Sequence, residues 1–278
     1  MIIPMKRIVT VQDISCVGKC SLTVALPIIS AMGVECAVIP TAVLSTHTMF
    51  SGFTFRDLTD DVTPITEHWK KENFGFDAIY TGYLGSFEQL RLVSKLIDDF
   101  PATVVIDPVM ADNGKLYTGF TVEFAKEMAR LCGKADVIVP NMTEASFMLG
   151  IDYVGSGYSE DYVKEVLKGL CGLGTKYAVL TGVDYGDGRL GVACMESATG
   201  KTFTYFRDRI DRSYHGTGDI YASSLVGALM NGMSLEDSLK VATDYTVACI
   251  ARTAADPDSV NYGVEFEKEI PYLLSLIK

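Results

Sequence analysis

The chain has 278 residues, of which 48% are hydrophobic and 21% are charged, and its mean hydropathy is +0.22. This composition is typical of a well-packed globular protein and excludes a disordered chain. The formal net charge of −11 disfavours negatively charged surfaces as partners, so we expect neither a nucleic acid nor a membrane to bind.

The chain begins with MIIPMKRIVTV, which lacks a long apolar segment with a cleavage site, so we expect no secretory leader. Seven cysteines, an odd number spread over the sequence, suit reduced thiols and a cytoplasmic protein. The most apolar stretch, residues 21–40, is about as long as a membrane span, but Pro27, Gly33 and Glu35 interrupt it. We therefore predict a buried helix followed by a buried strand there.

Short segments rich in β-branched residues alternate with helical segments through most of the chain. We predict strands at residues 7–12, 35–40, 77–82, 103–108, 136–140 and 177–182. We predict helices at residues 19–32, 60–72, 86–99, 120–132, 143–149 and 159–172. Strands that are apolar on both faces, with helices between them, predict a parallel sheet covered on both sides.

The pattern changes near residue 189. Residues 189–196 and 201–208 read as strands separated by a short turn with Gly200, which predicts an antiparallel hairpin at a sheet edge. Helices are predicted after it at residues 218–231, 234–253 and 264–276. Because neither a repeat nor a linker is visible, we expect a single domain over residues 1–278.

Polar residues follow the predicted strands. In open α/β sheets, ligands bind beyond the carboxyl ends of the strands, where loops and helix starts meet. The residues expected at those ends are Asp13, Gly82 with Tyr83, Asp107, Asn141 and Thr181.

The segment HGTGD (215–219) places two glycines before an acid at the start of a predicted helix. Gly216 and Gly218 allow a tight turn, and the helix start offers unpaired N–H groups to an anion. Asp219 could accept the proton of an alcohol while the amides hold a phosphoryl group. The alternative is an ordinary helix start, with Thr217 or Asp219 as the capping residue.

Two further acidic segments each allow two interpretations. In PNMTEA (140–145), Asn141 offers an amide and Glu144 could hold Mg2+ through water, or both could simply cap a helix. In IDPVMADNG (106–114), Asp107 ends an apolar strand and Asp112 precedes a tight Asn-Gly turn. A strand-terminal acid of this kind serves either a ligand site or the cap of the next element.

The loop TAVLSTHTMFSGFTF (41–55) combines His47 with hydroxyl and aromatic side chains. Ser45, Thr46 and Thr48 could bond a polar heteroaromatic ligand. Its phenylalanines could stack on such a ligand, but we expect them in the core, and they are Phe50, Phe53 and Phe55.

Together these segments resemble the pyridoxal/pyridoxamine kinases of the ribokinase superfamily. The segments that carry the resemblance occur in order over nearly the whole chain: RIVTVQDISCVGKCS (7–21), STHT (45–48), TGYLGS (81–86), DPVMAD (107–112), PN-x-x-E (140–144), LTG (180–182) and HGTGD (215–219). GTGD alone indicates only the superfamily, whereas STHT, TGYLGS and DPVM are more particular. The resemblance implies a ribokinase-like three-layer α/β sandwich with a mostly parallel central sheet, helices on both faces and an antiparallel edge hairpin.

The activity that the resemblance implies is ATP-dependent phosphorylation of the 5′-hydroxymethyl group of pyridoxal, pyridoxine or pyridoxamine. Asp219 would be the catalytic base, and the amides of Gly216, Thr217 and Gly218 would stabilise the transferring phosphoryl group. The resemblance further implies that Asp107 and Glu144 organise Mg2+ and the ATP phosphates. A monovalent cation, K+ or Na+, and a homodimer are also expected.

The remaining residues divide by ligand. By resemblance, the nucleotide would contact Asn141, Thr181 and Gly182, and a loop with Asp112 and Tyr117 would close over ATP. The pyridine ring would be surrounded by Asp13, Thr48 and Tyr83, with His47 on the same STHT loop.

Three positions depart from the family pattern. Position 13 is Asp where many pyridoxal kinases carry Ser, and a carboxylate there could pair with a protonated ring nitrogen or a cationic amine. Such a pair would favour pyridoxamine or an aminopyrimidine as substrate. Gly182 stands where relatives often have Ser or Lys, and Ala111 where Gly is usual. These two changes concern the nucleotide contacts and leave the base intact.

Two alternatives stay open. The first keeps the fold and makes hydroxymethylpyrimidine, or another small hydroxymethyl heterocycle, the substrate. The second is a non-catalytic protein that binds pyridoxal or a nucleotide. Asp219 argues against the second, because a pure binding protein needs no base at that position.

Overall fold

The computed structural model describes residues 5–277, and strands alternate with helices through most of that range. The described chain divides into two units, each with its own internal packing. Unit 1 contains the chain up to Leu84, Asp99–Ala102 and the chain from Ile210 onward, and unit 2 contains Gly85–Asp98 and Thr103–Arg209. The single domain expected over residues 1–278 stays a prediction, and the expectation about a leader falls partly on residues 1–4, outside the described residues.

The strands of unit 1 lie in the order β4-β1-β2-β3. Their bounds are β1 (Arg7–Ser15), β2 (Glu35–Leu44), β3 (Phe55–Asp57) and β4 (Ala78–Thr81). β1 pairs in parallel with both β2 and β4, as predicted, while β3 pairs antiparallel with β2 and was not predicted. β1 continues to Ser15, past the predicted end at residue 12, because Ile14 and Ser15 pair with β2 beyond a register shift.

The helices of unit 1 surround a shared apolar core. Their bounds are α1 (Leu22–Ala31), α2 (Thr59–Lys71), α7 (Thr217–Met230), α8 (Leu235–Ala255), the 3-10 turn η1 (Phe266–Glu269) and α9 (Ile270–Leu276). The predicted helix at 264–276 therefore starts as a 3-10 turn. The apolar stretch 21–40 folds as α1 followed by the first part of β2, which confirms the prediction of a helix and then a strand.

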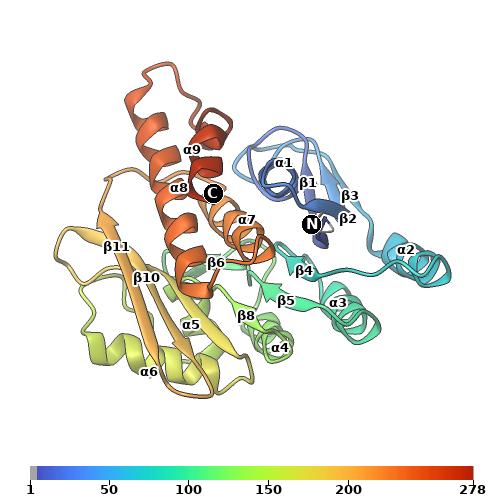
Figure 1. Cartoon of the computed structure of the whole chain (residues 1–278), viewed down its shortest axis with the longest axis horizontal. Coiled ribbons are helices and arrows are strands. Elements are labelled where there is room, and N and C mark those ends of the chain that lie inside the picture. Colours follow the sequence, from blue (N-terminus) through green and yellow to red (C-terminus); the bar gives the residue numbers. More distant parts are fainter. Residues whose placement is uncertain (1–4, 278) are drawn as a thin grey trace. The chain divides into compact units, whose positions relative to one another are not determined.

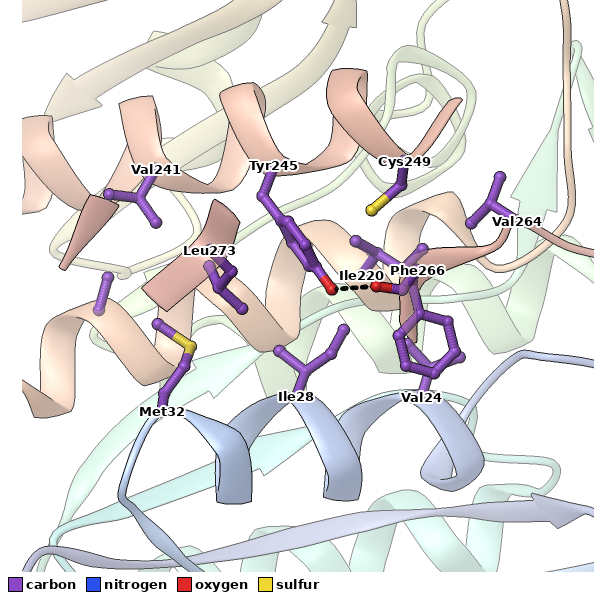
Figure 2. Packing of buried hydrophobic residues seen from close by; sticks show 11 residues of the cluster. Val24, Ile28, Met32, Ile220, Val241, Tyr245, Cys249, Val264, Phe266 and Leu273 are labelled. Carbon is purple, nitrogen blue, oxygen red and sulfur yellow. Dashed lines mark hydrogen bonds between the residues drawn. The ribbon is translucent and has the colours of Figure 1, made fainter. Parts of the chain in front are cut away.

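Figure 2 shows how this core positions the start of α7. Ile28 of α1 and Ile220 of α7 pack with Tyr245 of α8, and all three side chains are fully buried. The Tyr245 hydroxyl donates a hydrogen bond of 2.8 Å to the carbonyl of Phe266, so the phenol is satisfied inside the core. Burying a side chain the size of Ile contributes about 1.5–3 kcal/mol. Because Ile220 follows Asp219 directly, this packing holds the first turn of α7 in place.

The strands of unit 2 lie in the order β11-β10-β9-β8-β5. The bounds of its elements are α3 (Phe87–Asp99), β5 (Thr103–Ile106), β6 (Ala111–Asp112), β7 (Lys115–Leu116), α4 (Val122–Cys132), β8 (Val137–Ile138), α5 (Met142–Leu149), α6 (Glu160–Cys171), β9 (Tyr177–Val183), β10 (Arg189–Glu196) and β11 (Thr202–Asp208). β5, β8 and β9 are parallel, whereas β10 pairs antiparallel with both β9 and β11. The edge hairpin predicted around Gly200 is thereby confirmed, and Figure 1 shows its two strands beside β9.

A small hairpin of β6 and β7 in unit 2 was not predicted as strands. Its turn is the predicted one, with Asn113 at φ 50° and Gly114 at φ 76°, in the left-handed region that an Asn-Gly turn requires. With its parallel strands, surrounding helices and edge hairpin, the chain has the predicted α/β fold class. Among residues 5–277, no helix combines the length and the apolar character needed to cross a membrane.

Candidate active site

The start of α7 in unit 1 is open. Gly216 is its N-cap at φ 78°, and a Cβ at this position would collide with the carbonyl of Lys19, so glycine is required twice over. The first hydrogen bond of the helix runs from the Ile220 amide to the Gly216 carbonyl, 3.0 Å. The amides of Thr217, Gly218 and Asp219 precede it and have no partner within the helix.

No side chain caps this helix. The Thr217 hydroxyl donates instead to the carbonyl of Tyr214, 3.3 Å away. The alternative interpretation, in which Thr217 or Asp219 caps α7, is therefore wrong. Open amides at a helix start form the arrangement that binds a phosphate or another anion.

The Asp219 carboxyl is partly exposed, yet its surroundings are poor in water. Burial raises its pKa from 3.8 to about 7, an amide hydrogen bond from Ser21 opposes this rise, and the charge on Asp13 adds to it. A carboxylate with a pKa near neutrality suits a general base, because it ionises near pH 7 and still holds a proton well. Asp219 therefore has the surroundings that the predicted role requires.

Ser21 connects Asp219 to Asp13. Its amide donates to the Asp219 carboxylate and its hydroxyl to that of Asp13. Ser21 adopts φ 52° and ψ −134°, a conformation that L residues rarely adopt and that persists only where surrounding contacts enforce it. Strained backbone of this kind clusters at functional sites. The sequence analysis missed Ser21, because its role depends on hydrogen bonds to two acids that the sequence does not show to be its neighbours.

Asp13 lies inside β1 and not after it, which corrects the prediction. The pairing of β1 with β2 shifts register between Gln12 and Ile14, where two steps along β1 lie opposite three steps along β2, so Asp13 faces an irregular part of β2. It is 4% exposed, and the Ser15 hydroxyl donates to it at 3.0 Å. Burial raises its pKa. Ser15, like Ser21, was missed by the sequence reasoning.

His47 is buried, and both its ring nitrogens already contact backbone. Nδ1 accepts a hydrogen bond from the Met49 amide, 3.2 Å, and Nε2 lies 3.0 Å from the carbonyl of Tyr262. Since Nδ1 accepts, Nε2 carries the proton, and burial lowers the pKa, so the ring is neutral. Gly18 makes room for it, because a Cβ there would collide with the imidazole. The structure thus gives His47 a structural role, and its contact with substrate stays a prediction.

The rest of the STHT loop is more exposed than expected. Thr48 is exposed. Phe53 and Phe55 are 36% and 55% exposed, so the expectation that they belong to the core is wrong. Only Phe50 is partly buried, edge-on to His47 with ring centroids 5.3 Å apart. Beyond β4, the half-buried Tyr83 lies near Asp13, since burial first and then the Asp13 charge raise the pKa of its phenol.

The start of α5 in unit 2 is closed. Asn141 caps it by accepting from the Glu144 amide at 2.9 Å, and the Glu144 carboxylate accepts from the Asn141 amide at 2.9 Å. Glu144 also accepts from the amide of Met110 at 3.2 Å, and the Asn141 amide group donates to the carbonyl of Ala111 at 2.9 Å. This reciprocal capping box confirms the helix-start interpretation of PN-x-x-E and fixes the loop between β5 and β6.

Glu144 and Asp107 are the predicted ligands of Mg2+, and both are buried. Burial raises the pKa of Glu144 to about 8 despite the amides that it accepts from. The charges of both acids raise the pKa of the buried Cys132 thiol, so both lie near it. In the described part of the chain, no three His, Cys, Asp or Glu side chains are grouped to hold a metal. Two carboxylates fit an Mg2+ ion whose other ligands are water and phosphate oxygens, the usual arrangement for this ion.

The other residues predicted to bind the nucleotide form two groups within unit 2. Asn141 forms a parallel bridge with Thr181, whose amide donates to the Pro140 carbonyl at 2.9 Å. Gly182 follows at φ 66°, a left-handed conformation that explains glycine at this position. The small β6–β7 hairpin carries Asp112, and Tyr117 follows it, with both side chains exposed. Thr181 lies within β9, two residues before its end.

Comparison with known proteins assigns the sequence to a family. Residues 26–264 match the family described as phosphomethylpyrimidine kinase. The structure of a Bacteroides thetaiotaomicron protein, in an orthorhombic crystal form with pyridoxal, is 40% identical, with a TM-score of 0.92 and coverage of 97% of this chain and 96% of that one.

Two curated relatives have names that indicate different substrates. A pyridoxine/pyridoxal/pyridoxamine kinase of Bordetella avium is 27% identical over 262 residues, 88% of this chain and 85% of the relative. A chloroplastic thiamine biosynthetic bifunctional enzyme of Arabidopsis thaliana is 32% identical over 226 residues, which are 78% of this chain and only 41% of that longer protein.

Proposed function

The chain belongs to the phosphomethylpyrimidine kinase family, and from this premise we propose that it transfers the γ-phosphoryl group of ATP to the 5′-hydroxymethyl group of pyridoxal, pyridoxine or pyridoxamine. The Bordetella avium relative named for this activity and the Bacteroides thetaiotaomicron structure with pyridoxal support the proposal. The observation that carries the proposal is the uncapped start of α7, where open amides adjoin a carboxylate of near-neutral pKa.

In the proposed reaction, Asp219 accepts the proton of the acceptor hydroxyl as the oxygen bonds to phosphorus. The amides of Gly216, Thr217 and Gly218 stabilise the negative charge of the transferring group. Phosphoryl transfer depends on positioning and charge neutralisation more than on covalent participation by the protein, so a base and a set of fixed donors are what the chain must supply. The ring of the acceptor would contact Asp13, Thr48 and Tyr83 in unit 1.

Unit 2 supplies the proposed nucleotide contacts. Asn141, Thr181 and Gly182 lie along the nucleotide in this proposal, and the loop with Asp112 and Tyr117 closes over ATP. Mg2+, when bound with ATP, neutralises charge on the phosphates. Asp107 and Glu144 would hold it, Glu144 through water, because both of its carboxylate oxygens already accept backbone amides. A monovalent cation and a homodimer remain predictions from the family resemblance.

A second acceptor, hydroxymethylpyrimidine, is favoured by the family match and by the thiamine biosynthetic relative. One panel separates the two: purified protein with ATP and Mg2+, and each of pyridoxal, pyridoxine, pyridoxamine and hydroxymethylpyrimidine, scored for phosphorylated product. We expect the largest kcat/KM with one of the three pyridines. Turnover of the pyrimidine alone would replace the proposed substrate, and binding of pyridoxal without any turnover would favour a non-catalytic binding protein.

A further inference from the structure

Asp13 and Asp219 form a pair of acids in unit 1 that lacks a protein cation. Each affects the other, since Ser21 donates to both and the charge on Asp13 raises the pKa of Asp219. Within residues 5–277, no salt bridge includes either carboxylate. The nearby His47 ring is neutral and the Cys20 thiol, with a pKa raised to about 12, is uncharged as well. The negative charge at this place is therefore uncompensated by the protein.

Asp13 accepts hydrogen bonds from hydroxyls and forms no ion pair among the described residues. It caps no helix, and its carboxylate accepts hydrogen bonds from two serine hydroxyls, Ser15 and Ser21. These two donors hold the carboxylate in one orientation and favour its ionised form, although burial is the larger effect and raises its pKa. A buried carboxylate that is oriented but unpaired is costly for a protein unless a ligand supplies the opposite charge.

Two buried hydroxyls on the elements that carry Asp13 and Asp219, or pair with them, lack a hydrogen-bond partner among the described residues. The hydroxyls of Thr81 and Ser223 have no hydrogen-bond partner in the described part of the chain, and both residues are fully buried. Thr81 of β4 pairs with Val11 of β1, so it lies on the same face of the sheet as Asp13, two residues further along. Ser223 follows Asp219 by one turn of α7 and shares its face of the helix. Buried polar groups are normally satisfied, so these two hydroxyls are available to a polar group that comes between β4 and the start of α7.

We propose that Asp13 makes this site select an acceptor alcohol that carries an ammonium group, which among the three vitamers is pyridoxamine. This inference rests on the proposed kinase function. An aliphatic ammonium has an ordinary pKa of about 10.4 and is charged at neutral pH. Pyridoxamine therefore carries a full positive charge that pyridoxine lacks, while the two share the same ring nitrogen; the exocyclic amine of an aminopyrimidine is conjugated with its ring and is uncharged.

The test compares two acceptors that differ in one substituent, the aminomethyl group of pyridoxamine and the hydroxymethyl group of pyridoxine. For the unaltered protein we expect kcat/KM to favour pyridoxamine by about tenfold or more, the scale of a buried charge pair. In Asp13→Asn this preference disappears, chiefly through pyridoxamine. A preference that Asp13→Asn leaves unchanged, or no preference in the unaltered protein, would overturn the inference.

Asp77→Asn is the matched control, because Asp77 is an acid of unit 1 that pairs with Lys6 outside this cluster. It must leave the ratio of the two kcat/KM values unchanged. If Asp13→Asn does not fold, Asp13→Ser replaces it, with folding checked by thermal melting. Calorimetric titration of both vitamers without nucleotide gives a second readout. Were the protein to phosphorylate nothing, the kinase proposal would fail, while tighter binding of pyridoxamine that is lost in the variant would still support the role of Asp13.

Discussion

The helices α7 and α5 both start after a β-rich segment and both carry an acid in the first turn, but the two starts are built in opposite ways. At α5, Glu144 and Asn141 satisfy each other, and the acid is 3% exposed. At α7, glycine replaces the capping side chain, the amides stay open and Asp219 remains accessible. The first arrangement stabilises a helix and its neighbouring loop, and the second leaves both donors and carboxylate free for a ligand. An acid in the first turn of a helix is thus either held by the helix or free to meet a ligand, according to whether a capping side chain bonds the helix amides.

Removing the acid of the open start should have the largest effect. Asp219→Asn keeps the shape and the hydrogen bond from Ser21 but cannot accept a proton. We expect kcat to fall by about 10²-fold or more with acceptor binding largely retained. Steady-state kinetics and equilibrium titration of the acceptor measure the two quantities. Asp237→Asn, in the first turn of the Ser234-capped helix α8, serves as control and should keep normal turnover. A near-normal rate in Asp219→Asn would remove the residue from its role.

Closing the open start with a side chain should have the next largest effect. Gly216→Ala forces alanine into φ 78° and into the carbonyl of Lys19, and we expect a loss of about 2–3 kcal/mol in the free energy of unfolding. Gly232→Ala has a similar φ of 80° but open space around the new Cβ, so it isolates the conformational strain. Its loss should be about 1 kcal/mol. Chemical denaturation compares them, and equal losses would show that the Lys19 carbonyl is not a constraint.

Disrupting the capping box at the start of α5 should weaken the binding of ADP. Glu144→Gln leaves only one acceptor for the amides of Met110 and Asn141, and we expect a loss of about 1–3 kcal/mol in unfolding free energy. Because the same contacts fix the β5–β6 loop, ADP should bind more weakly while the acceptor binds unchanged. Glu123→Gln is the control, since Glu123 is an exposed acid in the first turn of α4, which Thr121 caps. Equal effects of both variants on ADP binding would contradict the proposed role of the capping box.

The pH dependence of kcat/KM tests the role of Asp219 as base. Asp219 must be ionised to act as base, and its pKa of about 7 lies above the ordinary value, so the active fraction falls as the pH drops below 7. We expect kcat/KM to be constant well above pH 7 and to fall about tenfold per unit well below it. The residual activity of Asp219→Asn should lack this limb. A limb that persists in that variant would assign the titration to another group.

The fold was largely predictable from local patterns, because alternating apolar strands and amphipathic helices appear in the sequence itself. The exceptions have physical reasons. β1 runs through the polar residues Asp13 and Ser15, whose side chains are buried only because hydroxyls and carboxylate satisfy one another. β3 is three exposed residues that pair only because β2 lies beside them. Neither segment has the alternation of apolar residues by which a strand is predicted from the sequence.

The site was predictable to the level of its motifs and no further. HGTGD and PN-x-x-E both indicated helix starts, but whether a start is open or capped depends on side-chain geometry that spacing does not contain. Ser21 was missed for the same reason, since its strained backbone and its two acceptors appear only in three dimensions. His47 was expected to contact substrate, and the structure shows that backbone atoms already occupy both ring nitrogens.

In the proposed reaction, the open start of α7 directs phosphoryl transfer to an alcohol. The most direct measurement follows the γ-phosphate: the protein is incubated with γ-labelled ATP, Mg2+ and pyridoxine, and the products are separated and identified by mass. We expect one labelled 5′-phosphate ester for each ADP formed. Label released as inorganic phosphate, with the pyridoxine recovered unchanged, would contradict it.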